Sequence, residues 1–255
     1  PTKDRDLYFK MLREQGFEKA TEYLLSSGTS KCSIKSLIKK LLRQTKKILK
    51  VRKNLIQVIG QNGLLNILKG TPSVYMHGKF VWEMHKGANV RVEKTDVNIG
   101  QSFVFKKSSL ESRVLVSSGA TLCLNGGTIS YGCDIELFKD ASLTIGENAL
   151  MNIGATIICA NKITLGDGVT LGRNVTIRDT HGGHFINRSD FKTTAPIEIG
   201  DHVWLCDDVI VMPGVKIGAG SVVAARSLVT KDVPPNTLVA GSPAQVIRQN
   251  VEWKR

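Results

Sequence analysis

The chain has 255 residues, of which 42% are hydrophobic and 22% charged, as expected for a soluble globular protein that can bury a full core. It contains no run of eighteen apolar residues, and its first residues lack the apolar stretch of a secretory signal, so neither a transmembrane helix nor a signal peptide is expected. The formal net charge is +13, and residues 1–70 hold sixteen of the 35 Lys and Arg residues against five acidic ones. We therefore expect this segment to contact something anionic.

Residues 1–70 are predicted to form a helical, basic N-terminal segment. Residues 6–25 favour one helix, with apolar residues at helical spacing. Residues 34–53 favour a second helix, which has apolar residues at the same spacing and no acidic residue. The second helix could dock on the rest of the protein or on another subunit, recruit an acidic polysaccharide, or lie on an anionic membrane surface. These three alternatives stay open. Nucleic-acid binding is not expected, because no recognised motif accompanies the charge.

The five cysteines are odd in number and widely spread, with no C-x-x-C pair. This pattern favours free thiols in a reducing compartment. We expect a cytoplasmic protein, and residues 34–53 offer a peripheral contact with the inner face of the membrane.

From residue 153 onward, an apolar residue falls at every sixth position, first in Ile153, Cys159, Leu165, Leu171 and Ile177 and then in Ile199, Leu205, Val211, Ile217, Val223 and Val229. A companion series lies two positions earlier, and a small residue often follows the main position. The apolar face of an α-helix recurs at three and four residues, so this period excludes a helix.

A six-residue period predicts a triangular coil, in which each hexapeptide is a short strand plus a corner and three of them make a turn of eighteen residues. Small corner residues permit a tight bend, and Gly can adopt positive φ there. The 22 residues from Ile177 to Ile199 equal one coil plus four, so we expect an excursion at 178–196. The predicted domains are 1–70, a coil domain at 71–240 and a tail at 241–255.

The C-terminal half contains V-W-L at 203–205, P-G-V-K-I-G at 213–218, S-L-V-T-K-D at 227–232 and G-S-P-A-Q-V-I-R at 241–248. In this order and spacing, the motifs resemble the hexapeptide-repeat acyltransferases, particularly the galactoside, maltose and polysaccharide O-acetyltransferases of bacteria. The resemblance implies a mainly β fold, a left-handed parallel β-helix. It also implies a homotrimer with active sites between subunits, and acetyl-CoA as co-substrate.

Acetyl transfer to a hydroxyl needs a base, and histidine suits this role. The excursion carries His181 and His184, and the family's base lies in a Gly-His pair that matches Gly183-His184. His184 is therefore favoured over His181, although Phe185 stands where family members often have Pro. His202 occupies a coil corner and is expected to be structural.

Other site residues are implied by the resemblance. Asn152 matches an acceptor-hydroxyl ligand, although a corner residue that satisfies backbone groups explains it nearly as well. Asp207 occupies the position of the oxyanion donor, which only its backbone N–H could fill. Cys206 is expected to be a core residue, and no acyl-enzyme is expected.

The co-substrate residues also come from the resemblance. Ala224 and Ala225 match the stretch that lines the pantetheine arm of CoA. Thr230, Lys231 and Arg248 match phosphate contacts, and Arg226 could add another.

The leading hypothesis is an acetyl-CoA-dependent O-acetyltransferase that acts on a sugar hydroxyl, in a capsular polysaccharide, a lipopolysaccharide or a precursor, with His184 as base and no metal. The acceptor could be an acidic polysaccharide. The alternatives are N-acetylation of an amino sugar, a zinc hydratase of the same fold using His181, His184 and His202, and a non-catalytic scaffold.

Overall fold

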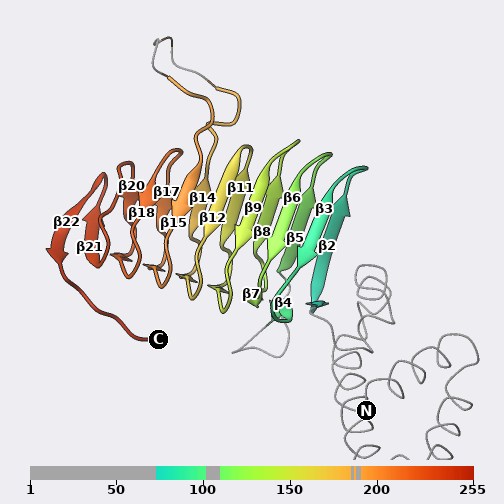
Figure 1. The fold of residues 1–255 in the computed structure, drawn as a ribbon, viewed down its shortest axis with the longest axis horizontal. Coiled ribbons are helices and arrows are strands. Elements are labelled where there is room, and N and C mark those ends of the chain that lie inside the picture. Colours follow the sequence, from blue (N-terminus) through green and yellow to red (C-terminus); the bar gives the residue numbers. More distant parts are fainter. Residues whose placement is uncertain (1–72, 102–109, 185–186, 188–190) are drawn as a thin grey trace, which may run out of the picture.

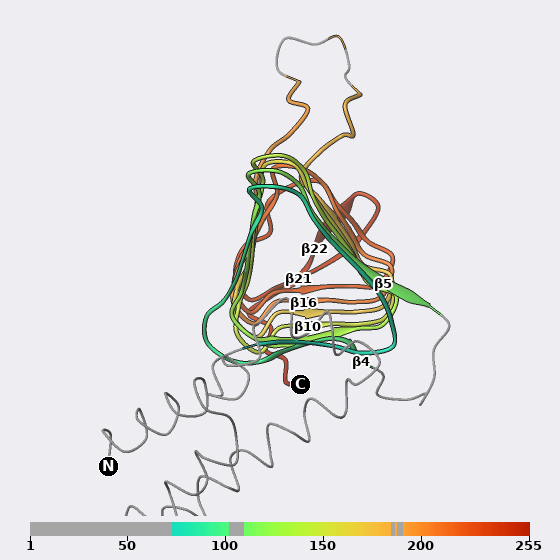
Figure 2. The ribbon, with the colours of Figure 1, turned by 90° about the vertical axis from the view of Figure 1, so that its right-hand side faces the viewer.

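The computed structural model describes residues 73–101, 110–184, 187 and 191–255, which form a triangular prism of short strands (Figures 1 and 2). The helices expected within residues 1–70 lie outside the described residues. The described part of the chain contains no helix that is long and apolar enough to cross a membrane. In that part, the predicted mainly β architecture is confirmed, with three sheets as the sides of the prism.

Each sheet collects every third strand of the chain, except that the last two strands both join the first sheet. Sheet A consists of β1 (Val74–Met76), β4 (Val97–Gln101), β7 (Gly127–Ser130), β10 (Leu150–Met151), β13 (Thr170–Leu171), β16 (Trp204–Leu205), β19 (Val222–Val223), β21 (Thr237–Gly241) and β22 (Ala244–Gln249). Sheet B consists of β2 (Lys79–Met84), β5 (Glu111–Val116), β8 (Asp134–Leu137), β11 (Thr156–Cys159), β14 (Thr176–Arg178), β17 (Ile210–Val211) and β20 (Leu228–Val229). Sheet C consists of β3 (Asn89–Val92), β6 (Thr121–Leu124), β9 (Ser142–Ile145), β12 (Lys162–Leu165), β15 (Ile197–Ile199) and β18 (Lys216–Ile217).

The chain visits the sheets in the order A, B, C, and strands of successive coils pair in parallel. Figure 2 looks along the prism from its N-terminal end. There the path runs from sheet A at the bottom to sheet B on the right and sheet C on the left, counter-clockwise as it recedes. This sense of rotation makes the coil left-handed, as the resemblance implied, and sets it apart from the usual right-handed crossover.

The length of a coil varies along the prism. Trp204 pairs with Val222, which gives the expected eighteen residues, whereas Ile135 pairs with Ile157, which gives 22. Thr170 and Trp204 are partners 34 positions apart. The excursion therefore adds sixteen residues to a regular coil of eighteen, and the expectation of one coil plus four is wrong. Ile177 and Ile199 in fact lie on consecutive strands, β14 and β15, on either side of a single corner.

The apolar residues of the repeat point into the prism and form one continuous core. Leu165, Leu171 and Ile177 are at most 1% exposed, as the period predicts. Ile153 differs, since it is half-buried at the corner after β10, where its N–H donates to Asn152 Oδ1 at 2.8 Å. Met151 fills the core at this level instead.

The small residue after the main position is required by close approach between coils. A Cβ on Gly172 would lie 2.6 Å from the backbone nitrogen of Asp207 in the next coil, closer than real Cβ atoms come. The expected reason, positive φ, holds at Gly154, whereas at the corners of Gly172 and Gly200 it applies two positions later, at Asn174 and at His202. These two corners therefore have one position selected by space and one selected by backbone conformation.

The last strand ends the prism differently. β22 pairs antiparallel with β21, and the chain then runs back along the outside of the prism (Figure 1). We call residues 250–255 the C-terminal strap. The N–H of Val251 donates to the carbonyl of Asn236 at 2.9 Å, and Arg255 donates to the carbonyl of Asn148 at 3.0 Å.

Candidate functional site

The excursion leaves the corner between sheets B and C and projects away from the prism (Figure 2). Its base is held by Asp179, which is fully buried. The Asp179 carboxylate accepts hydrogen bonds from the N–H groups of Ala160 and Asn161 in the preceding coil, at 2.6 and 2.8 Å. Thr180 and Thr194 form an antiparallel bridge between the two arms. The loop therefore starts from a fixed stem, although it lies far outside the core.

The two loop histidines have different surroundings. His181 is half-buried, its N–H donates to the carbonyl of Thr193 at 2.9 Å, and its ring lies 5.0 Å from that of Phe191. His184 is exposed, and its N–H donates to the carbonyl of His181 at 3.4 Å. The His184 imidazole is thus the one that is free to approach a second molecule. This geometry favours His184 as the base, as does the Gly-His match in the sequence.

The corner between sheets A and B gathers a second group of predicted residues. Asn152 follows β10, and Asp207 follows β16 on the same edge. The Asp207 carboxylate accepts a hydrogen bond from the N–H of Arg173 at 2.7 Å, so this side chain stabilises the corner. Asn152 Oδ1 is similarly occupied by the N–H of Ile153. Asn152 Oδ1 and one Asp207 carboxylate oxygen therefore have structural partners, and the Asn152 amide N–H groups and the Asp207 backbone N–H remain for a ligand.

Cys206 is half-buried at this corner, so the prediction that it is a core residue is wrong. Burial raises the pKa of its thiol, and the neighbouring Asp207 charge raises it further. A thiol with a raised pKa holds its proton at neutral pH and is a poor nucleophile. This environment gives no support to covalent catalysis through Cys206.

The predicted CoA contacts are divided between edges. Ala224 and Ala225 follow β19 on the A–B edge, and the Ala224 N–H donates to the carbonyl of Val239 at 2.9 Å. Thr230 and Lys231 follow β20 on the B–C edge and are exposed. Arg248 is exposed on β22.

The basic residues near the predicted CoA site differ in whether they form ion pairs. Within the part of the chain that the structure describes, neither Lys231 nor Arg248 forms an ion pair. Arg226 differs, because its Nε lies 3.8 Å from an Asp208 carboxylate oxygen. Lys231 and Arg248 thus keep their charge available for phosphates.

One chain therefore divides the predicted site into two halves. Asn152, Asp207 and the two alanines lie on the A–B edge, whereas the loop histidines and Lys231 lie on the B–C edge, with sheet B between them. His202 is on the third edge, between sheets C and A, where its ring stacks on Trp253. His202 is thus separated from the loop histidines within one chain, which fits the structural role expected for it. Among the described residues, no three His, Cys, Asp or Glu side chains come together as a metal site.

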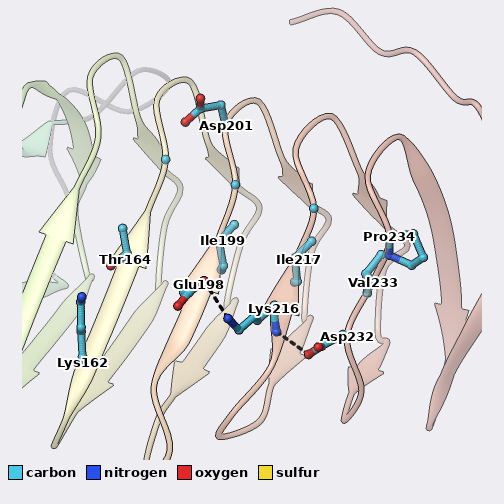
Figure 3. A pocket seen from close by; sticks show the side chains of 13 residues that line it. Lys162, Thr164, Glu198, Ile199, Asp201, Lys216, Ile217, Asp232, Val233 and Pro234 are labelled. Carbon is cyan, nitrogen blue, oxygen red and sulfur yellow. Dashed lines mark hydrogen bonds and ion pairs between the residues drawn. The ribbon is translucent and has the colours of Figure 1, made fainter.

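Two features were missed at the level of sequence. A shallow hollow of about 740 Å³ lies on sheet C, where Lys216 pairs with Glu198 at 3.2 Å and its N–H donates to Asp232 at 2.8 Å (Figure 3). It contains none of the predicted site residues. The second feature is Arg178, the last residue of β14, whose Nε donates to the carbonyl of Thr180 at 2.7 Å. The position of a basic residue directly before the loop is the sequence feature that could have indicated Arg178.

The chain is similar to several known proteins. Residues 196–231 match the family model described as bacterial transferase hexapeptide (six repeats). The chain is 33% identical to galactoside O-acetyltransferase of Escherichia coli over 191 residues, which cover 72% of this chain and 83% of that protein. It is 38% identical over 127 residues to a putative colanic acid biosynthesis acetyltransferase of E. coli, with 42% of this chain and 70% of that protein covered. A hexapeptide-repeat acetyltransferase of Vibrio cholerae complexed with acetyl-CoA is 32% identical, with a TM-score of 0.41 and coverage of 51% of this chain and 70% of that chain.

Proposed function

The chain belongs to the hexapeptide-repeat acetyltransferases, and from that membership we propose that it transfers an acetyl group from acetyl-CoA to a hydroxyl group of a sugar. Its relatives include a galactoside O-acetyltransferase and a putative colanic acid biosynthesis acetyltransferase. We propose a surface polysaccharide or its precursor as the acceptor. The observation that carries the proposal is the exposed His184 imidazole on a loop whose stem is anchored by the buried Asp179.

In the proposed reaction both substrates are bound together. The neutral His184 imidazole takes the proton of the acceptor hydroxyl while its oxygen attacks the thioester carbonyl carbon. The Asp207 backbone N–H donates to the oxyanion that develops, and the Asn152 amide orients the acceptor. The C–S bond then breaks, and the CoA sulfur receives the proton from His184. The products are an acetyl ester and free CoA, and His184 is restored.

This mechanism requires a second copy of the chain. The base lies on a loop that projects outward from the B–C edge, whereas Asn152 and Asp207 lie on the A–B edge of the same prism. An excursion from a neighbouring prism can cover that edge, so we propose a homotrimer with each site between two copies. Apolar side chains exposed on sheets A and B, including Trp204 and Ile210, support contact through these faces.

The CoA phosphates are proposed to bind Lys231 and Arg248, whose charges are exposed and unpaired among the described residues. The pantetheine arm would follow the small Ala224 and Ala225. We propose a cytoplasmic location. The four cysteines within the described residues are all free, which supports a reducing compartment. Contact of residues 34–53 with a membrane or an acidic polymer remains a prediction.

The test is thiol release from acetyl-CoA against a panel of bacterial polysaccharides, with wild type, His184→Ala and His181→Ala. We expect turnover on at least one polymer, and a loss of about 100-fold or more in kcat with His184→Ala. His181→Ala, which removes a ring packed on Phe191, is the matched control and should retain activity. Equal activity of His184→Ala and wild type would refute the assigned base. Transfer to amino sugars alone would indicate an N-acetyltransferase.

A further inference from the structure

Arg178 has no role in the mechanism above, yet it lies at the base of the catalytic loop. It is the last residue of β14, it is half-buried, and it pairs with Ile158 of the preceding coil. Its Nε donates to the carbonyl of Thr180 at 2.7 Å. This bond fixes the plane of the guanidinium while leaving the N–H groups of both terminal nitrogens for other partners.

The guanidinium lies close to the proposed base. A Cβ placed on Gly182 would be 3.5 Å from Arg178 Nη2 and 4.0 Å from His184 Cδ2. The two side chains therefore approach each other to within 7.5 Å, the sum of these two distances. At Gly183 the same construction meets no atom of the described residues within 4 Å, so these residues leave space beside the pair. A ligand that reaches His184 can also reach Arg178.

Arg178 lacks a counter-charge within the described residues. It forms no ion pair there, although Asp179 is its neighbour in sequence. The Asp179 carboxylate points inward, where the N–H groups of Ala160 and Asn161 occupy it. A half-buried cation next to an imidazole that must accept a proton would be stabilised by an anion supplied by the substrate.

We propose that Arg178 determines acceptor specificity by binding the carboxylate of an acidic sugar residue, next to the hydroxyl that is acetylated. Since Nε is occupied, the carboxylate would bind end-on through Nη1 and Nη2, a two-point contact that a neutral sugar cannot make. The net charge of +13 would attract such an acidic polymer. This inference rests on the proposed acetyltransferase function and names its class of acceptor.

The test compares sialic-acid and uronic-acid polymers with the same polymers after reduction of their carboxyl groups to alcohols. For wild type we expect kcat/KM on the accepted polymer to fall by roughly 10- to 100-fold on reduction. Arg178→Gln should lower kcat/KM on the acidic polymer by a similar factor. Reduction of the polymer's carboxyl groups should then lower the kcat/KM of this variant little further. Arg178→Lys should recover part of the activity, and the KM for acetyl-CoA should stay constant.

The matched control is Arg113→Gln, which changes an exposed arginine on the same sheet that is paired with Asp134. It should behave as wild type. An equal loss by Arg178→Gln on acidic and reduced polymers would overturn the proposal, because Arg178 would then act on the loop or the thioester. A raised KM for acetyl-CoA would assign it to the co-substrate.

A binding experiment separates this inference from the proposed function. Calorimetry with the acidic polymer and no acetyl-CoA measures acceptor recognition even where turnover is absent. We expect wild type to bind the acidic polymer, and Arg178→Gln to bind it roughly tenfold or more weakly. Binding without any turnover would refute the acetyltransferase proposal alone. Equal affinities of the two proteins, or no binding by wild type, would refute the role of Arg178.

Discussion

The ring of His202 lies flat against the indole of Trp253, with ring centroids 4.0 Å apart and planes inclined by 2°. Two hydrogen bonds close the pair: Trp253 Nε1 donates to the His202 carbonyl at 2.9 Å, and His202 Nε2 donates to the Trp253 carbonyl at 3.0 Å. Trp204 contacts the same indole at 5.7 Å between centroids. The C-terminal strap is thus fastened to the C–A edge of the prism.

Replacing Trp253 by Ala should lower the free energy of unfolding by about 2–3 kcal/mol, because it removes stacking, a hydrogen bond and half-buried apolar area. Chemical denaturation would measure the change. Glu252→Ala, at the exposed position next to it, is the control and should leave stability within about 0.5 kcal/mol. A Trp253→Ala protein as stable as the control would show that the strap contributes nothing.

Asp179→Asn should weaken both the stem of the loop and catalysis. The carboxylate accepts two N–H groups, whereas an Asn amide has one oxygen and would turn its own N–H₂ toward the other donor. We expect about 2 kcal/mol lower stability and, because His184 loses its fixed support, roughly 10-fold or more lower kcat. Asp201→Asn is the control, since its carboxylate accepts one N–H among the described residues, that of Asp167, which an amide oxygen can also accept. Unchanged kcat in Asp179→Asn would refute the anchoring role.

Much of the coil could be predicted from the sequence, because a column of inward side chains requires an apolar residue at each sixth position. Leu171 and Val211 satisfy that rule as buried residues. Ile153 obeys the spacing but not the burial, since a corner can hold an apolar residue on its outer side. The size of the insertion was also missed. The spacing between Ile177 and Ile199 does not reveal whether a whole coil or one corner separates them.

Long-range contacts and the arrangement of the site were beyond sequence reasoning. The strap meets His202 across 51 residues and Asn148 across 107, and such contacts leave no periodic signal. The sequence placed Asn152 and His202 at corners, but only the topology shows that Asn152 and His184 lie on different edges. Arg178 was missed because its importance depends on the direction of its side chain.

Cys206→Ser should retain most of the activity. The thiol lies at the corner beside Asp207, and both burial and that charge raise its pKa, so it is a poor nucleophile at neutral pH. We expect kcat/KM within about threefold of wild type, since the mechanism needs no acyl-enzyme. Mass spectrometry after incubation with acetyl-CoA alone should find no acetylated Cys206 peptide. An acetylated peptide that disappears on addition of acceptor would contradict direct transfer.

Stability should fall in alkaline solution because of two core thiols, Cys133 and Cys159. Burial is the main cause that raises the pKa of both, that of Cys133 from 9.0 to about 12, and for Cys159 the Asp179 carboxylate adds to the effect. Above pH 9 the unfolded chain loses these protons while the folded protein keeps them, so unfolding becomes more favourable as pH rises. Each thiol should approach a loss of ~1.4 kcal/mol per pH unit between its unfolded and folded pKa values. Denaturation curves at pH 8.0, 9.5 and 10.5 would measure this slope. A Cys133→Ala/Cys159→Ala protein should show a smaller slope, and identical slopes in the two proteins would assign the alkaline sensitivity to other groups.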